Sequence, residues 1–360
     1  MKFLLERKWI LLAAAGAVLL LVVLLAVMLS SCKEQPADPA PPTTVATTTT
    51  KTTTTTKPPV RFENLLTGEA ELKTKRNRPV AFMIGNSGYY GPLQQKNIEK
   101  ADLFVEAETE AGIPRIMAVF GSIENVPDEI GPVRSARTHF VKIAKSLDAI
   151  YCHIGGSPIG LKTIRQNGIT DMNGMGGNFA KPNQQLWDAN RASEHTKVFI
   201  RKNLVETMKN RGTLDTTLLD SPYRFGDKKG EKRCKTVELN ISASKKVAFT
   251  YVYKSGVYKK HRTDLSSDIH KSIDGKAITA KNVIIMYDER YWEDKTHVSF
   301  QMKAGEGLLL VNGTARSIRW SRTDDRLSFT EQDGTPLTVA QGKTYICLTD
   351  KNLAGKTEIQ

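Results

Sequence analysis

Short apolar runs alternate with segments of helical spacing between residues 78 and 167, and this alternation limits the folds open to the chain. Each apolar run is short and lies next to turn-forming residues, as buried strands do, and the runs are 78–85, 113–121 and 149–154. Apolar residues recur at helical spacing in 133–147, 158–167 and 195–210, whereas 97–112 contains either a strand at 102–107 or a helix at 98–111. Strands interleaved with helices predict an α/β domain with a mixed or partly parallel sheet.

The stretch 131–158 (GPVRSARTHFVKIAKSLDAIYCHIGGSP) is predicted to begin with a helix that carries Arg134 and Arg137 in its first turns. A proline is tolerated at the start of a helix, and residues three apart share one helix face. A helix N-terminus with two guanidinium groups is suited to bind a carboxylate or a phosphate. The alternative is that nearby carboxylates hold both arginines, namely Asp102, Glu106 or Glu108. Arg115, at the start of a predicted strand, has the same two interpretations.

The predicted strand 149–154 leads through His153 into a tight Gly-Gly-Ser-Pro loop. Ligands of open α/β sheets collect at the carboxyl ends of strands, and histidine moves protons near neutral pH. His153 is therefore a ligand-binding candidate, and with Glu106 it is a candidate acid–base pair. Ser157 is a further ligand-binding candidate, but it precedes a proline and lacks a GxSxG context, so we interpret it first as a helix N-cap.

From about residue 223 the sequence changes to short strand-like runs separated by Gly-containing turns. The runs are 247–253, 256–261, 282–287, 298–302, 308–311, 317–320 and 344–348. This pattern predicts a mostly antiparallel β domain. We place an α/β domain at 61–222 and a β-rich domain at 235–355. Arg262, Asp268 and His270 lie in a polar connection, which is either a secondary contact site or a solvated loop.

The first sixty residues differ from a globular domain. A basic start precedes the apolar run 10–29, which ends in Leu-Ser-Ser-Cys at Cys32. This is typical of a lipoprotein signal peptide at 1–31, with Cys32 lipidated (for example with palmitate); the alternative is an uncleaved anchor. Residues 32–60, rich in Thr and Pro, are predicted to be a disordered tether. We expect a Gram-positive cell-membrane protein, lipid-anchored on the extracytoplasmic face.

The formal net charge of +14 favours anionic partners. For an extracytoplasmic chain these are the membrane surface and cell-wall polymers, and no basic run interleaved with aromatics indicates nucleic acid. Cys152 and Cys347 lie in apolar runs, and with Cys234 they form no pattern of a disulfide framework or zinc site. Whether two of these three cysteines form a disulfide is left open by the sequence. We expect no metal and no cofactor.

Several blocks occur in an order that resembles the YerB-like bacterial lipoproteins, a family built on the domain of unknown function 3048. They are RPVAFMI at 78–84, GIPRIMAVF at 112–120, IGPVRSAR at 130–137 and DAIYCHIGGSP at 148–158, with later matches around 282–285, 305–308, 320 and 342–346. The resemblance covers about 78–348 and implies an anchored extracytoplasmic protein with N-terminal α/β and C-terminal β-rich domains, without an established reaction. The chain departs from the expected Asn-Asn pair at Asn86-Ser87, where Asn86 is a ligand-binding candidate.

Three functions follow from these observations. The first is a non-enzymatic envelope lipoprotein that binds a wall polymer or membrane-protein partner near Arg134, Arg137 and His153. The second is a hydrolase of peptidoglycan or another surface glycan, with Glu106 and His153 as acid and base. The third is a passive tethered scaffold.

Overall fold

The computed structural model describes residues 60–73, 78–87, 93–214, 220–242, 247–262 and 268–360. The predicted signal peptide, the predicted lipidation site Cys32 and residues 33–59 of the predicted tether lie outside the described residues. Residues 58–360 form one compact unit. In the described part of the chain, no helix has the length and apolar character needed to cross a membrane.

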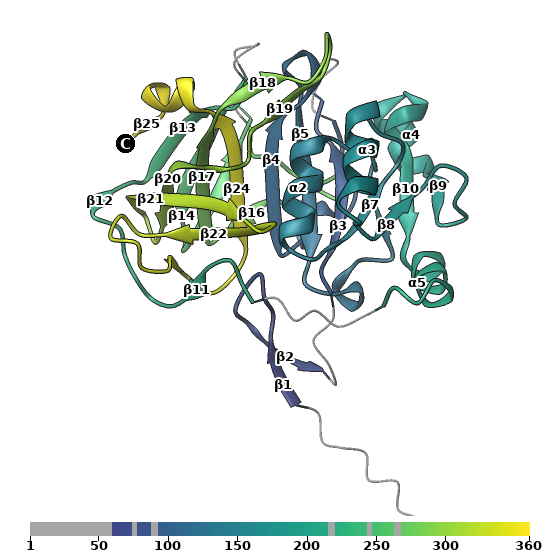
Figure 1. Ribbon diagram of the computed structural model, residues 1–360, viewed down its shortest axis with the longest axis horizontal. Helices are drawn as coiled ribbons and strands as arrows, with labels where there is room; N and C mark the ends of the chain where they lie inside the picture. The colour runs from purple at the N-terminus through teal and green to yellow at the C-terminus, as the bar shows by residue number, and fades with distance from the viewer. Residues whose placement is uncertain (1–59, 74–77, 88–92, 215–219, 243–246, 263–267) are drawn as a thin grey trace, which may run out of the picture. The chain divides into compact units, whose positions relative to one another are not determined.

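A mixed sheet of eleven strands runs through this unit (Figure 1). Its order is β12 (Lys232–Arg233), β21 (Thr314–Thr323), β20 (Ala304–Val311), β17 (Asn282–Asp288), β24 (Thr344–Asp350), β4 (Leu103–Glu108), β5 (Pro114–Phe120), β3 (Val80–Gly85), β7 (Ile150–His153) and β8 (Asp171–Asn173), with β22 (Arg326–Thr330) on β21. The pairs β17–β24, β24–β4, β3–β7 and β7–β8 are parallel. The mixed sheet expected for the N-terminal part is therefore present.

The two predicted domains share this sheet. Strand β24 of the C-terminal part pairs in parallel with β4 of the N-terminal part, from Thr344 opposite Leu103 to Leu348 opposite Ala107. Both strands are buried along their whole length. Strands that are buried along their whole length are expected where both faces of a sheet are covered. The predicted ranges 61–222 and 235–355 thus both contribute residues to each of the two buried hydrophobic clusters.

Different elements cover the two faces of the sheet. Helices α2 (Thr138–Ser146) and α3 (Pro158–Gln166) pack on one face, where Phe140 and Ile164 join Met83 and Tyr151 in one buried cluster (Figure 1). The other face carries the sheet β16 (Thr279–Ala280), β15 (Val257–His261), β14 (Ala248–Lys254), β13 (Thr236–Asn240) and β25 (Glu358–Ile359), and beside it α5 (Arg201–Asn210) and β10 (Lys197–Ile200). Side chains alternate between the faces along each strand.

Smaller elements complete the described chain. They are the hairpin β1 (Val60–Glu63) and β2 (Ala70–Lys73), β6 (Glu129–Ile130) and β9 (Ala180–Pro182) on either side of β10, the parallel pair β11 (Arg224–Phe225) and β23 (Thr338–Val339), the hairpin β18 (Arg290–Trp292) and β19 (Val298–Phe300), and helix α4 (Gln184–Asn190). The 3₁₀ turns are η1 (Ile98–Lys100), η2 (Glu110–Gly112), η3 (Ile123–Asn125), η4 (Ser193–His195) and η5 (Lys351–Lys356). Cys152, Cys234 and Cys347 are buried and free.

Two predicted helices differ from the structure, and the first, expected over 133–147, begins only at Thr138. Residues 131–137 are extended and lie against β3: Arg134 N–H donates to Met83 O (2.8 Å), and Val133 bridges to Ile84. Pairing with a neighbouring strand has outweighed the helical spacing of the apolar residues. The expected helix over 195–210 is divided into η4, β10 and α5, and the ambiguous segment 102–107 is strand β4.

Candidate functional site

The carboxyl ends of β3, β7 and β8 lie at one edge of the sheet, because these three strands are parallel. The extended segment 131–137 runs between the first two of them. It is held on one side by Arg134 N–H to Met83 O and on the other by Ile154 N–H to Arg134 O (3.0 Å). Strand β5 is antiparallel to β3, so its first residues reach the same edge. Arg115, Arg134 and Arg137 are therefore brought to one edge of the sheet; that they bind a ligand there stays a prediction.

One carboxylate, that of Glu110, joins two of these arginines. Arg137 donates through Nε to Oε2 (2.7 Å) and through Nη2 to Oε1 (2.5 Å), and Arg115 donates through Nη2 to Oε1 (2.9 Å). Their other donors reach backbone carbonyls, Arg115 at Ser135 O and Arg137 at Ala136 O, both 2.8 Å away. Such forked contacts fix both charge and orientation. The predicted alternative partners of the arginines, Asp102, Glu106 and Glu108, are not the ones used in these contacts.

The charges in this group shift each other's pKa. Burial by itself would raise the pKa of the Glu110 carboxyl, but the charge of Arg115 and the hydrogen bonds and charge of Arg137 outweigh it and hold the pKa far below its usual range. Burial, with the like charge of Arg137, lowers the pKa of Arg115 to about 10. Arg115 remains protonated at neutral pH. We call Glu110, Arg115, Arg134 and Arg137 the arginine cluster, in which three guanidinium groups accompany one carboxylate.

Arg134 is the half-buried member of the cluster, whereas Arg115 and Arg137 are buried. Its Nη1 donates to Glu194 O (2.5 Å), and its aliphatic stem lies over Gly85, where an added Cβ would be 3.1 Å from its Cγ. His195 lies near it: burial, and then the charge of Arg134, lower the pKa of His195. Nδ1 of His195 has no hydrogen-bond partner among the described residues. A ligand approaching this edge would therefore contact Arg134 first.

His153 and Ser157 have internal partners. His153 is fully buried, with Nδ1 2.7 Å from Gly155 O and Nε2 3.0 Å from a carboxylate oxygen of Asp171. The Ser157 hydroxyl accepts from Gly160 N–H (3.0 Å) and caps α3, which was the first interpretation of this residue. Both side chains thus fasten the loop after β7.

Glu106 and Asn86 lie in a buried polar network. Glu106 accepts from Lys260 Nζ at both oxygens (2.8 and 2.6 Å), from Tyr345 Oη (2.7 Å) and from Asn86 Nδ2 (2.5 Å). Asn86 Oδ1 in turn accepts from Arg262 Nη1 (2.7 Å). Burial lowers the pKa of Lys260, although Glu106 opposes this effect. We call Asn86, Glu106, Lys260, Arg262 and Tyr345 the buried network; it links β4 to strands of the C-terminal part.

The candidate acid–base pair Glu106 and His153 is not brought together. Strands β5 and β3 lie between their strands β4 and β7, which corresponds to about 14 Å at the usual strand spacing. The two side chains also project from opposite faces. Glu106 alternates with Val105 and Ala107, which face α2, whereas the ring of His153 stacks on Tyr151 at 5.3 Å on the α2 side. Proton transfer between an acid and a base at one substrate atom requires contact with both.

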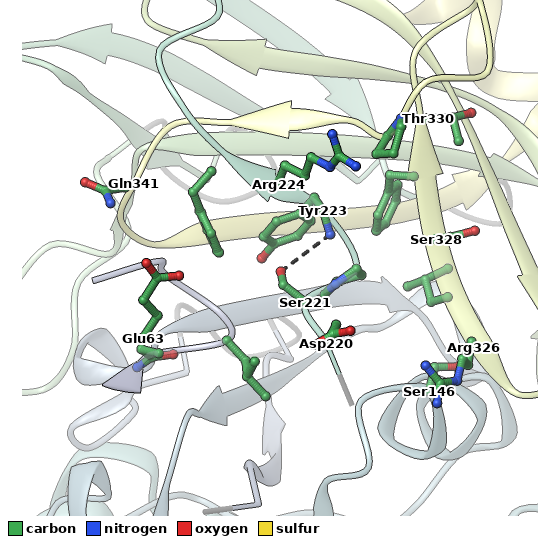
Figure 2. A pocket seen from close by; sticks show the side chains of 17 residues that line it. Glu63, Ser146, Asp220, Ser221, Tyr223, Arg224, Arg326, Ser328, Thr330 and Gln341 are labelled. Atoms are coloured by element: carbon green, nitrogen blue, oxygen red, sulfur yellow. Dashed lines mark hydrogen bonds between the residues drawn. The ribbon is translucent and has the colours of Figure 1, made fainter. Parts of the chain in front are cut away.

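A cavity of about 730 Å³ lies away from the arginine cluster, next to Tyr223 and Arg326 (Figure 2). Its walls include the aromatic residues Tyr223, Phe225 and Phe329, with Glu63 and Gln341 at one side of the view and Arg326 with Ser146 at the other. Tyr223 Oη donates to Leu66 O (3.1 Å). None of the site residues predicted from the sequence lines this cavity, so it provides no support for those predictions.

Sequence reasoning missed Glu110, His195 and Lys260. Glu110 follows Glu106 and Glu108 at alternating positions, and the sequence does not show that the strand ends at Glu108 and that Glu110 turns toward the arginines. His195 opens the segment 195–210, for which the sequence predicted a helix and no ligand contact. Lys260 stands in an alternating strand pattern at a position that faces the core; a lysine on the inward face was the available signal.

Comparison with known proteins gives two family matches, one related protein and one related structure. Residues 66–214 match the N-terminal domain and residues 237–346 the C-terminal domain of the protein of unknown function DUF3048. The protein named "Putative lipoprotein YerB" from Bacillus subtilis (strain 168) is 26% identical over 296 residues, covering 78% of this chain and 84% of the relative. The crystal structure of YerB from Bacillus subtilis has a TM-score of 0.70 and 23% identity, covering 83% of this chain and 99% of that one. The chain therefore belongs to the DUF3048 family and contains both of its domains.

Proposed function

We propose that this protein is a lipoprotein, anchored at Cys32 on the extracytoplasmic face of the membrane, whose folded part binds an anionic group of a cell-envelope ligand at the arginine cluster. The apolar run ending at Cys32 and the name of the related YerB protein support the anchor. The Thr- and Pro-rich residues after Cys32 would separate the binding domain from the membrane.

The observation that carries the binding proposal is the unequal charge of the arginine cluster. Glu110 is shared by Arg115 and Arg137, so one carboxylate balances two buried guanidinium groups, and Arg134 adds a third. The guanidinium of Arg134 donates to the backbone carbonyl of Glu194, and the charge of the Glu194 side chain also favours the protonated form of Arg134. Three guanidinium groups therefore face two carboxylates, Glu110 and Glu194, which leaves one positive charge in excess. Arg134 would make the direct contact with a carboxylate or phosphate, and the buried pair would add to the local positive potential.

The experiment compares the binding of residues 58–360 to purified cell-wall sacculi and to anionic lipid vesicles. Arg134→Ala should weaken binding to the true ligand severalfold, because it removes the accessible guanidinium without breaking the contacts of Glu110. Arg165→Ala, at an exposed position on α3, is the matched control and should bind as the unchanged protein does. Equal binding by both variants would contradict the proposal.

The same samples test the hydrolase alternative. Release of soluble wall fragments by the unchanged protein would establish hydrolysis, and the absence of fragments with Arg134-dependent retention is the expected result. Sacculi retention distinguishes a wall polymer from a lipid headgroup, since each is presented in a separate experiment.

A further inference from the structure

Strand β8 ends the eleven-stranded sheet and has an open outer edge. It is the last strand in the sheet order, and among the described strands it pairs only with β7, in parallel. Two hydrogen bonds mark the ends of this pairing: Tyr151 N–H donates to Thr170 O (2.9 Å), and Gly174 N–H donates to His153 O (2.8 Å). An edge strand presents a row of backbone donors and acceptors to which a second chain can pair.

The backbone groups on the outer side of β8 belong to Asp171 and Asn173. Successive residues of a strand direct their backbone groups to opposite sides, and Thr170, Met172 and Gly174 direct theirs to β7. The N–H and C=O groups of Asp171 and Asn173 therefore point away from the sheet, and none of the four has a hydrogen-bond partner in the described part of the chain. Both residues are partly exposed, with 34% of the Asp171 side chain accessible. Four backbone groups are thus open to a partner.

A helix covers each face of β8, so that its open edge lies between two helices. On one face, Met172 packs in a buried cluster with Leu204 and Met208 of α5. On the other face, which α3 covers, Asp171 is held by Nε2 of His153, 3.0 Å from its carboxylate oxygen. A new strand would lie about 4.8 Å beyond β8. An extended chain is therefore the shape that fits this edge.

The two helices beside the edge are basic. Arg211, directly after α5, donates through Nη1 to Sδ of Met172 (3.6 Å), which places a cation at β8 itself. The helices contain one acidic residue, Glu206. The exposed basic residues of α3, of α5 and of the position after α5 have no ion-pair partner among the residues that the structure describes, and they are Lys162, Arg165, Lys202, Lys209 and Arg211. Charge complementarity favours an acidic partner here.

We propose that the open edge of β8 binds an extended acidic segment of a partner protein, which adds to the sheet as a further strand. The backbone of that segment would bond to the four outward groups of Asp171 and Asn173, and its acidic side chains would lie near Arg211 and the basic helices. A second copy of this chain would bring two sets of basic helices together, and like charges oppose such pairing. The proposal is independent of ligand binding at the arginine cluster.

Hydrogen exchange of individual amides tests the edge directly. The probe is a capped hexapeptide of alternating glutamate and valine, added to residues 58–360 and followed by NMR. In the free protein, the amides of Asp171 and Asn173 should exchange fast and that of Met172 slowly, because only the last points to β7. Saturating peptide should slow exchange at Asp171 and Asn173 by at least about tenfold. Slow exchange of these two amides in the free protein, or no change with the peptide, would overturn the proposal.

Two further peptides test the kind of contact. A hexapeptide of alternating lysine and valine should bind at least about tenfold more weakly, because its charges repel the basic helices. Methylation of the backbone nitrogens of the glutamates in one peptide and of the valines in another should give unequal results, since only alternate N–H groups of a strand face its neighbour. Equal binding by the acidic and basic peptides, or equal effects of the two methylations, would contradict strand pairing with an acidic segment.

Arg211→Glu tests the charge at the edge without removing a buried group. The variant should bind the acidic peptide about three- to tenfold more weakly and keep the melting temperature of the unchanged protein, because Arg211 is exposed. Lys295→Glu, in the exposed connection between β18 and β19, makes the same change of charge and is the matched control. Equal affinity of the acidic peptide for both variants would show that the basic residues beside β8 do not select the partner.

Discussion

Glu106 and Glu110 are four residues apart, and each lies beside basic side chains, but their surroundings differ. Glu106 is fully buried between two layers and contacts Lys260, with Arg262 one hydrogen bond further away. Glu110 lies at the sheet edge with 27% of its side chain exposed and contacts Arg115 and Arg137. In the interior, each charge is stabilised by its ion-pair partner, because water cannot take the place of that partner. At the edge, water and dissolved ions can compensate part of the stabilisation that is lost when one member of an ion pair is removed.

Breaking the buried ion pair between Glu106 and Lys260 should have the largest effect on the free energy of unfolding. Glu106→Gln or Lys260→Met alone should lower the free energy of unfolding by about 3–5 kcal/mol, since each leaves an uncompensated buried charge. The double variant should recover a large part of this loss. Urea denaturation followed by circular dichroism measures all three changes. The exposed pair Lys351 and Glu289, 3.0 Å apart, is the control, and Glu289→Gln should cost less than about 1 kcal/mol. Equal losses of unfolding free energy at the buried and the exposed pair would show that burial does not determine the cost of removing a partner.

Glu110→Gln should have a smaller effect, about 1–3 kcal/mol, because charge-assisted hydrogen bonds are lost at a partly exposed position. The folded-state pKa of Glu110 is depressed, so its carboxylate stabilises the fold fully above the unfolded pKa of about 4.3. The unfolded state takes up the proton first as the pH falls, and this stabilisation is then lost progressively. Unfolding at several pH values should show that Glu110→Gln removes part of the acid sensitivity. An identical pH dependence in both proteins would contradict the assigned contacts.

These two regions also show how far the sequence could predict the structure. The strands of the sheet followed from short apolar runs, whereas the ligand site was expected near Arg134, Arg137 and His153. The segment 133–137 was assigned to a helix because its spacing is helical, but hydrogen bonds to Met83 and Ile154, distant in sequence, keep it extended. The partners of the arginines depend on where β4 ends and on how η2 turns, which a pattern of alternating glutamates does not determine.

The buried network was even harder to predict from the sequence than the arginine cluster. Its members lie on β4, β15 and β24 or directly after β3 and β15, and they meet because the C-terminal strand β24 pairs with β4. The sequence suggested two domains, and a boundary drawn between them separates Glu106 from Lys260. Contacts between segments 154 residues apart have no local signal in a single sequence. An unusual lysine on the inward face of a strand indicates that some partner exists, but it does not identify that partner.

The smallest predicted effect tests a side chain for which the sequence left two roles open. Ser157 was a ligand-binding candidate and a predicted N-cap, and its hydroxyl accepts from Gly160 N–H at the start of α3. Ser157→Ala should cost about 1 kcal/mol of stability, the usual value for a lost N-cap, and should leave sacculi binding unchanged. Asn183, which caps α4 in the same way through Leu186 N–H, is the matched control, and Asn183→Ala should cost a similar amount. A loss of binding at Ser157 without a loss of stability would place this residue among the ligand contacts, and the ligand would then have to extend from Arg134 across the loop after β7.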